Sequence, residues 1–378
     1  IGAGFGHALF GYGLLAAAAH TSARARPRVR GRGFQLAVSL PAQTFLATGF
    51  LCGAWFLALA LPRAVLALTG WDAGLAALRW LDWVPLGIGA AALVTSLRQR
   101  LETVRIRLGD AGPERVERVP HARYRGRAPD LSGPRPLRIA QIADPHLGPW
   151  QTVEKLRRRA ASLVAQEPDL VALTGDFLTM ESHDAAEALA RALEPLRELR
   201  GRCFAVFGNH DLEAPDAISD ALRANHVELL IDAEKRVRTE AGAVQVVGAN
   251  HVWRDRERHL GELLARFPRV PSHLRLLLLH DPSAFAHVAP GEVDLTLSGH
   301  THGGQLGLLS LGLPWTVLSR TRWPDHGLFA RGAGRLYVHR GTGFYGFPLR
   351  VGVPGEHSIL EVFRAEPAGG GEATAFAH

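Results

Sequence analysis

Long uncharged stretches fill the first quarter of the chain, whereas the remainder alternates short apolar runs with helix-type patterns. Three runs carry no formal charge: residues 1–22, 33–62 and 83–97. A helix needs about 20 mostly apolar residues to cross the hydrocarbon of a bilayer, so the first two runs qualify and the third is borderline. We therefore predict about three membrane spans within residues 1–97. Pro41 and Pro62 should mark the ends of the second span, because proline is best tolerated near helix termini.

Arginines flank these runs in a pattern that bears on orientation. They gather after the first run and again after the third: Arg24, Arg26, Arg28, Arg30 and Arg32, then Arg98, Arg100, Arg105 and Arg107. With three spans, both clusters lie on one side, which the positive-inside rule assigns to the cytoplasm. The sequence thus predicts a multi-pass cell-membrane protein with its following domain on the cytoplasmic face. A buried, wholly helical domain is the alternative interpretation.

Composition and charge narrow the classes of partner. The chain has 378 residues, of which 47% are hydrophobic and 21% charged, so it is not a disordered protein. The net charge of +7 raises nucleic acid as a partner, but arginines placed beside apolar runs favour anionic membrane lipids instead. Cys52 and Cys203 cannot build a disulfide framework or a paired-cysteine metal site. Since Ile1 opens the chain with no basic stretch before the first run, we expect further residues upstream and no signal peptide.

The pattern beyond the apolar region divides the chain further. Residues 98–136 are polar and weakly patterned, which indicates a basic juxtamembrane connector. Residues 366–378 are rich in glycine and alanine, which is typical of a disordered tail. Between them, residues 137–365 show the pattern of an α/β domain, a sheet covered by helices. We predict strands at 137–143, 169–174, 203–207, 274–279 and 294–298, and helices at 152–166 and 183–199.

All five predicted strands end in side chains that can bind a metal. The segments are Asp144-Pro145-His146, Gly175-Asp176, Gly208-Asn209-His210-Asp211, His280 and Gly299-His300-Thr301-His302. Open α/β sheets place their sites at the carboxyl ends of strands, so we expect these residues to form one constellation. Each segment alone has an ordinary explanation as a turn, a helix cap or a buried histidine. Together they match a pair of divalent metals held by hard oxygen and borderline nitrogen ligands.

The spacing of these residues supports a two-metal site. Asp144 and His146 are two residues apart, as are His300 and His302. Side chains at i and i+2 of an extended strand point the same way, so each pair can reach one metal cluster. A single carboxylate, Asp176, can bridge both ions.

These motifs, in this order, resemble those of the calcineurin-like metallophosphoesterases, also called binuclear metallophosphatases. The resemblance covers about residues 137–363, and the extended Gly-His-Thr-His-Gly-Gly-Gln at 299–305 looks like the bacterial branch that is often membrane-anchored. It implies a four-layer α/β/β/α sandwich, in which two mixed sheets lie face to face with helices outside. The chain departs from the family pattern at Thr179, where an aspartate is common.

The resemblance also implies roles for the site residues. Two divalent ions of manganese, iron, zinc or magnesium would share one carboxylate. The implied ligands are Asp144, His146, Asp176 and His302 for one ion, and Asp176, Asn209, His280 and His300 for the other. His210, oriented by Asp211, would lie over the substrate phosphate as general acid or charge stabiliser. A hydroxide bridging the ions would attack phosphorus in line.

The expected activity is hydrolysis of a phosphoester or pyrophosphate bond by a membrane-anchored enzyme. A lipid-linked substrate such as UDP-diacylglucosamine is one candidate, because the bacterial branch resembles enzymes that split its pyrophosphate. A general phosphodiesterase or phosphatase acting on a soluble phosphoester or nucleotide would use the same metal core. Two further alternatives are a zinc-dependent amidase with one metal and a non-catalytic, membrane-tethered binding module.

Overall fold

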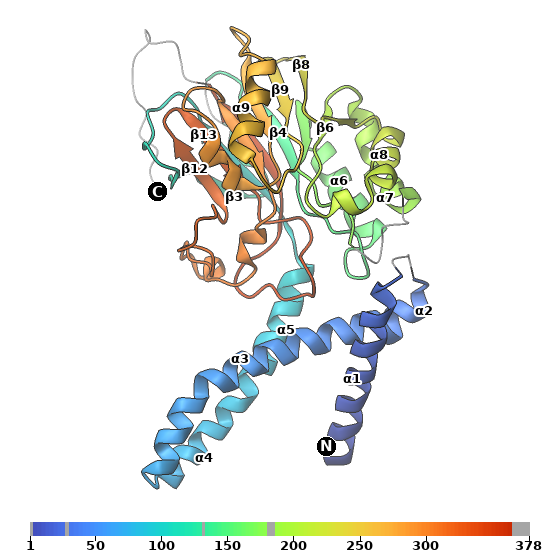
Figure 1. Ribbon diagram of the computed structural model, residues 1–378, viewed down its shortest axis with the longest axis vertical. Coiled ribbons are helices and arrows are strands. Elements are labelled where there is room, and N and C mark those ends of the chain that lie inside the picture. Colours follow the sequence, from blue (N-terminus) through green and yellow to red (C-terminus); the bar gives the residue numbers. More distant parts are fainter. Residues whose placement is uncertain (1–2, 27–29, 131–132, 180–185, 365–378) are drawn as a thin grey trace.

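The protein is described here by a computed structural model that covers residues 3–26, 30–130, 133–179 and 186–364. Figure 1 shows a group of N-terminal helices below a domain of strands covered by helices. The predicted tail at 366–378 lies outside the described residues.

Three helical segments make up the described N-terminal region. They are α1 (Ala3–Arg24), α2 (Arg32–Phe34) continuing through a π-helical turn into α3 (Leu40–Leu68), and α4 (Asp72–Trp80) continuing through a 3₁₀ turn into α5 (Val84–Leu97). Within the described residues, two segments are long and apolar enough to cross a membrane: 32–68 and 72–97. Two of the three predicted spans therefore meet the requirement of length and composition. The first predicted span forms α1 but is not among those two, so it stays a prediction.

Pro62 lies inside a helix, not at its end. We predicted that the second span ends there, but α3 continues to Leu68; Pro41 lies in the first turn of α3, although the continuous helical segment already begins at Arg32. Proline is tolerated inside long apolar helices because neighbouring groups satisfy the backbone oxygen that it leaves unpaired. The chain then reverses at Gly70, whose φ of +64° is readily adopted by glycine. The last membrane-type segment begins at Asp72, before the predicted start, which we place at residue 83 or as early as Arg79.

Two mixed sheets of seven strands each form the described part of the domain. In spatial order the first sheet contains β3 (Ala122–Arg125), β1 (Arg100–Arg107), β14 (Glu356–Phe363), β4 (Leu137–Ile142), β5 (Leu170–Leu173), β6 (Cys203–Ala205) and β7 (Glu228–Leu229). The second contains β2 (Glu117–Arg118), β12 (Gly327–Arg331), β13 (Gly334–Val338), β11 (Leu295–Ser298), β10 (Leu274–Leu278), β9 (Gly242–Gly248) and β8 (Ala233–Thr239). The five predicted strands are thus confirmed as β4, β5, β6, β10 and β11.

Helices cover the outer face of each sheet, which confirms the predicted four-layer sandwich. Three amphipathic helices bury leucines against the first sheet: α6 (Val153–Val164), α7 (Ala186–Leu193) and α8 (Pro215–Ala224). On the second sheet, α9 (Arg256–Arg266) does the same with Leu260 and Leu263. A third apolar cluster fills the space between the sheets. Each fully buried leucine contributes roughly 1.5–3 kcal/mol, so these clusters stabilise the layered arrangement.

The segment that we expected to be a connector supplies three strands instead. Strand β1 pairs in parallel with β14 over its whole length, and Val104 and Ile106 are fully buried between the sheets. The many charges in this segment concealed the strand from the hydrophobic pattern. In the fold those charges are paired: the Glu102 carboxylate lies 2.7 Å from the guanidinium of Arg123 and 2.7 Å from that of Arg340. The two sheets therefore include residues well before Leu137.

The N-terminal helices and the domain meet at one small apolar cluster. Ala47 of α3 and Ala92 of α5 pack against Leu349, and Leu306 joins the cluster. Beside it, the backbone N–H of Arg350 donates a hydrogen bond of 2.9 Å to the Ser96 hydroxyl of α5. Figure 1 shows α5 rising directly into the domain at this contact. The loops around residues 306 and 350 are therefore fixed to the helices.

Candidate metal centre

The predicted site residues lie on loops that follow the carboxyl ends of strands from both sheets. Their positions are Asp144 and His146 after β4, Asp176 after β5, Asn209 and His210 after β6, His280 after β10, and His300 and His302 after β11. Because β4, β5 and β6 are parallel neighbours, as are β10 and β11, these loops emerge at the same edge of their sheets. The fold therefore brings residues from five chain segments to one place.

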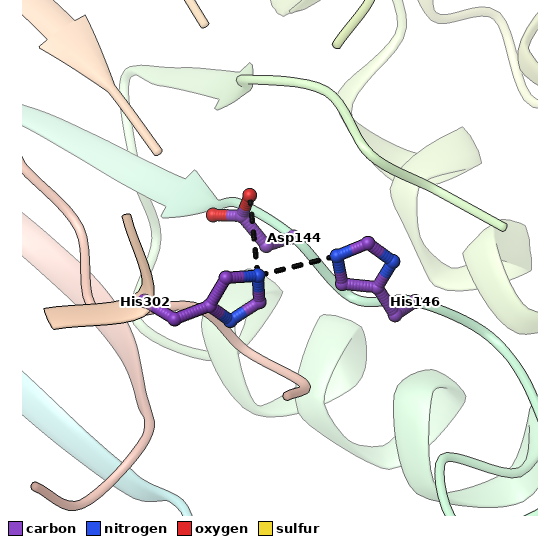
Figure 2. Close-up of side chains that lie close together, drawn as sticks. All are labelled: Asp144, His146 and His302. Atoms are coloured by element: carbon purple, nitrogen blue, oxygen red, sulfur yellow. Dashed lines mark hydrogen bonds and ion pairs between the residues drawn. The ribbon is translucent and has the colours of Figure 1, made fainter. Parts of the chain in front are cut away.

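One group of donors consists of Asp144, His146 and His302, whose ligand atoms lie within 4.8 Å of one another. The Nε2 atoms of the two imidazoles are 3.2 Å apart, and Nε2 of His302 lies 3.7 Å from Oδ1 of Asp144. Figure 2 shows the three side chains converging on one point. All three are buried.

A second group consists of Asp176, His280 and His300, again with ligand atoms within 4.8 Å. Asn209 belongs to it as well, because its Oδ1 lies 3.2 Å from Nε2 of His280 and 2.9 Å from Nδ1 of His300. The other ring nitrogen of His280 faces the backbone oxygen of Thr174 at 2.7 Å. A hydrogen bond there fixes the ring orientation and leaves Nε2 directed at the group.

Asp176 lies between the two groups. Its Oδ2 is 3.3 Å from Nε2 of His280 and 3.7 Å from Nε2 of His146. Its Oδ1 accepts the backbone N–H of His210 at 3.0 Å, which fixes the carboxylate plane. One carboxylate thus faces both sets of donors, which is the geometry that a bridging ligand needs.

The backbone at these positions differs from the extended strand on which the i, i+2 argument rests. Five of the donor residues have positive φ: Asp144 (49°), His146 (44°), Asp176 (58°), His300 (73°) and His302 (51°). Non-glycine residues rarely adopt this left-handed conformation, and such strain gathers at functional sites. The pairs do converge, but they do so through sharp turns after the strands, and the extended-strand reasoning is wrong.

Glycine is required at two positions around the donors. A Cβ atom on Gly299 would overlap Oδ2 of Asp144, and one on Gly208 would overlap Oδ1 of Asp176. Any larger residue at either position would push a donor carboxylate out of place. The motifs Gly-His-x-His and Gly-Asn-His-Asp therefore include their glycines for steric reasons.

Burial sets the protonation of the donor groups. It lowers the pKa of His146 and of His300 to about 4 and holds the pKa of His302 well below its usual value, so these imidazoles are neutral and can offer a lone pair. For His280, burial acts to lower the pKa, but Asp176 and Asp144 raise it to about 10. A cation bound at His280 therefore competes with a proton, and its binding weakens as the pH falls.

The donor set fits divalent cations. Oδ2 of Asp144 is buried and has no hydrogen-bond partner within the described part of the chain, although a buried carboxylate oxygen normally has one. A metal ion would satisfy it. Imidazole nitrogens together with carboxylate and amide oxygens suit borderline and hard divalent ions such as zinc, iron, manganese and magnesium. Asp144, His146, Asp176 and His302 could hold one ion, and Asp176, Asn209, His280 and His300 another.

Asp211 does not orient His210, contrary to our expectation. Its Oδ2 accepts the backbone N–H groups of Asp176 (2.6 Å) and Gly208 (2.7 Å), and its Oδ1 accepts that of Phe177 (2.8 Å). These three bonds direct the fully buried carboxylate at the backbone. Asp211 is a positioning residue for the loops that carry the donors.

The His210 imidazole lies at the open side of the site, with about a quarter of its surface exposed. Its Nδ1 is 3.4 Å from Oε1 of Glu213, and its ring centre is 5.5 Å from that of His146. His210 is thus adjacent to the donors without belonging to either group.

Three residues near the site escaped the sequence reasoning. The half-exposed Tyr345 ring lies 5.3 Å from His210 and 5.9 Å from His146. The fully buried Arg350 donates to the backbone oxygen of His302 at 3.2 Å. His251 is buried 5.9 Å from His280. His251 follows β9, so the signal that found the others, a polar residue after a strand, would have found it too.

Comparisons with known proteins agree with this geometry. A family model described as calcineurin-like phosphoesterase matches residues 137–304, which include every predicted donor. Phosphodiesterase YaeI of Escherichia coli (strain K12) is 30% identical over 232 residues, covering 60% of this chain and 82% of that protein.

Two further relatives differ in how much of their length is matched. The uncharacterized metallophosphoesterase YkuE of Bacillus subtilis (strain 168) is 28% identical over 222 residues, covering 57% of this chain and 74% of that protein. A transmembrane protein with metallophosphoesterase domain from Danio rerio is 29% identical over 239 residues, covering 57% of this chain and 50% of that protein.

Proposed function

The chain belongs to the calcineurin-like phosphoesterase family, and on that premise we propose that it is a membrane-anchored enzyme that cleaves a lipid-linked phosphoester or pyrophosphate. UDP-diacylglucosamine is an example of such a substrate. Membership of the family makes the chain a metal-dependent phosphoester hydrolase. The substrate class rests on one observation, the contact between the loops of the metal centre and the apolar helices.

Two residues near the donors, Leu306 and Arg350, make this contact with the helices. Leu306 lies four residues after the donor His302, and it packs in the same cluster as Ala47 of α3 and Ala92 of α5. Arg350, which holds the backbone of His302, is itself bonded to Ser96 of α5. A site held against membrane-type helices favours a scissile bond close to the bilayer surface.

The helices themselves support an anchor. Trp71 is exposed at the α3–α4 turn, whereas Trp80 and Trp83 are exposed where α4 continues into α5. Figure 1 shows that turn at the end of the helices far from the domain. An exposed tryptophan at the end of apolar helices, as Trp71 is, is typical of the membrane–water interface. Both arginine-bearing flanks, next to α2 and after α5, lie at the opposite end beside the domain, which supports the cytoplasmic orientation that we propose.

A loop of the domain adds a second apolar surface beside the helices. The segment between His302 and β12 exposes Leu311, Leu313 and Trp315, and it also exposes Arg320 and Arg322. Apolar side chains together with cations are the composition of interfacial membrane contacts. This surface therefore supports the proposal that the domain contacts the bilayer.

The chemistry follows from the placement of the chain's own residues. Divalent cations, when bound, polarise the phosphoryl group and lower the pKa of water to near neutrality. Asp176 sets the distance between the two donor groups, and the neutral oxygen of Asn209 limits the negative charge around them. Burial of the donors excludes bulk water, which strengthens electrostatic interactions with a transition state.

We assign His210 the role of general acid or charge stabiliser. It lies at the open side, within reach of a substrate held over the donors, and the carboxylate of Glu213 beside its Nδ1 can orient the ring. The ring of Tyr345 lies beside His210 and borders the same open side of the site. This arrangement needs no nucleophilic side chain.

A hydrolysis screen of the full chain in detergent tests the proposal. The substrates are UDP-diacylglucosamine in mixed micelles, bis(p-nitrophenyl) phosphate and p-nitrophenyl phosphate, each with manganese, zinc and magnesium, and Asp176→Asn serves as the control for contaminating phosphatases. We expect the highest kcat/KM for the lipid-linked substrate. A higher value for a soluble ester would support a general phosphodiesterase or phosphatase, and no turnover by the metal-loaded protein would support a binding module.

A further inference from the structure

A cavity of about 640 Å³ separates the N-terminal helices from the phosphoesterase domain. One wall comes from residues 30–40, where α2 leads into α3. The other comes from residues 147–155, which include the loop after the donor His146 and the first turn of α6. Cavities of this size hold small organic ligands, so the gap can accommodate a head group and part of a chain.

Positive charge dominates the polar part of the lining. Arg30, Arg32 and Lys155 line the cavity together with one carboxylate, Glu154. Two of the cations are held in place: Arg30 donates to the backbone oxygen of Ala23 at 2.8 Å, and Lys155 donates to that of Trp150 at 2.9 Å. Fixed cations lose little side-chain entropy when they bind an anion.

The positive potential extends along α6. A smaller cavity of about 300 Å³ adjoins Lys155 and is lined also by Arg158, Arg159 and His357. Burial, and then the charges of Arg159 and Arg158, lower the pKa of Lys155. An anion beside Lys155 would therefore relieve repulsion among these cations.

Apolar side chains complete the lining. Leu36 and Leu40 come from the helix wall, and Leu147, Pro149 and Trp150 come from the domain wall. A free inorganic anion would make no favourable contacts with these apolar side chains. Cations next to apolar side chains match a molecule with a charged head and a hydrocarbon tail.

The cavity lies between a membrane-type helix and the loop that follows the donor His146. Arg32 begins the longer membrane-type segment, 32–68, at the end near the domain. On the opposite wall, Leu147 directly follows His146, and its backbone N–H donates to the oxygen of Phe177 at 2.8 Å. A lipid could therefore reach the cavity from the bilayer while its head group lies near the donors.

We propose that this cavity binds an anionic membrane amphiphile, with its phosphate on Arg32 and Lys155 and the start of its acyl chain on Leu36, Leu40 and Trp150. It thereby presents the head group to the His146 side of the metal centre. This inference rests on the proposed function, since it specifies how a lipid-linked substrate would be held.

Photo-crosslinking of the full chain in phosphatidylcholine nanodiscs tests the proposal. The probes are photoactivatable phosphatidic acid and phosphatidylcholine with the same acyl chains, and adducts are mapped by mass spectrometry. We expect the phosphatidic acid probe to label residues 30–40 and 147–155 in preference to the neutral probe. Because each basic residue near a membrane contributes about a five-fold gain in anionic-lipid binding, Arg32→Ala with Lys155→Ala should lower this labelling roughly 30-fold.

A matched control removes two arginines elsewhere. Arg236 and Arg238 are exposed on β8, which lies at the far side of the domain in Figure 1. Arg236→Ala with Arg238→Ala should leave labelling unchanged, and both double variants should retain the wild-type metal content.

Three results would overturn the proposal. They are equal labelling by the two probes, unchanged labelling in the Arg32 and Lys155 variant, and displacement of the probe by soluble glycerol phosphate at a concentration equal to that of the lipid. The last would identify a site for free phosphate. Labelling requires no hydrolysis, so absence of turnover contradicts the proposed function, whereas absence of site-specific labelling contradicts this inference alone.

Discussion

Oδ2 of Asp211 accepts the backbone N–H of Asp176 at 2.6 Å, so a buried carboxylate holds the residue that faces both donor groups. Because the same carboxylate also accepts the N–H groups of Gly208 and Phe177, it ties the loop after β5 to the loop after β6. The distance between the donors thus depends on a residue that belongs to neither donor group.

Asp211→Asn should weaken metal binding and lower the free energy of unfolding by about 2–4 kcal/mol. The amide has only one acceptor oxygen, and its NH₂ group would face backbone donors that the carboxylate now satisfies. Metal analysis and denaturant unfolding in detergent measure the two effects. Glu213→Gln, a nearby change outside these bonds, is the control. Normal metal content and stability with slow turnover would instead restore the predicted role in orienting His210.

His210→Ala should lower kcat by about 10² to 10⁴ while metal content stays at the wild-type level, because we assign it to the transition state and not to the donors. His280→Ala, which removes a donor, should lose metal. If His210 protonates the leaving oxygen, a p-nitrophenyl ester should be the substrate least affected. A raised KM with equal losses for all substrates would show that His210 only binds the phosphate.

Asp176→Asn should remove most of the bound metal as well as the activity. Its Oδ2 lies within 3.7 Å of a histidine in each group, so its negative charge serves both. Metal analysis of the purified variant at neutral pH is the measurement. Two retained equivalents of metal with near-normal turnover would contradict the bridging assignment.

His339 should make the fold less stable in acid. Burial lowers the pKa of this fully buried imidazole from 6.5 to about 4, and its Nδ1 accepts the backbone N–H of Gly341 at 3.0 Å. Between those values the unfolded chain binds a proton that the folded chain does not, so stability is complete above about pH 6.5 and falls as the pH is lowered towards 4.

The variant His339→Asn keeps an acceptor oxygen but does not titrate. Wild type should therefore lose about 2 kcal/mol more than His339→Asn between about pH 7.5 and pH 5, measured as free energies of unfolding in detergent. Equal losses of unfolding free energy in the two proteins would show that the pKa of His339 is not lowered in the folded protein.

The site was more predictable than the backbone that builds it. Asp144, His146 and the other donors follow apolar strands at short range, and strand ends meet at one edge of a sheet, so local sequence indicated the cluster. The left-handed turns were not predictable, because non-glycine residues adopt them only when the surrounding fold compensates for the strain.

Long-range pairing explains the remaining errors. Strand β1 carries arginines and a glutamate that look solvent-exposed, and only the fold reveals their partners, such as Glu361 for Arg105 at 2.9 Å. The carboxylate of Asp211 likewise seemed available to the adjacent His210, whereas its partners include backbone groups 34 and 35 residues away. Neither of these long-range interactions can be predicted from the local pattern of hydrophobic and polar residues.

The position of β1 also determines the order in which the protein can fold. Its parallel partner β14 begins about 250 residues later, at Glu356, so about 250 further residues must be synthesised before the first sheet can close. Under the membrane anchoring that we propose, the helices are inserted by then, and β1, two residues after the end of α5, lies near the membrane surface. Under the proposed anchoring, folding is completed against an anchored strand, and a fragment that starts at Leu137 would lack the strand that lies beside β14, leaving an edge that invites aggregation.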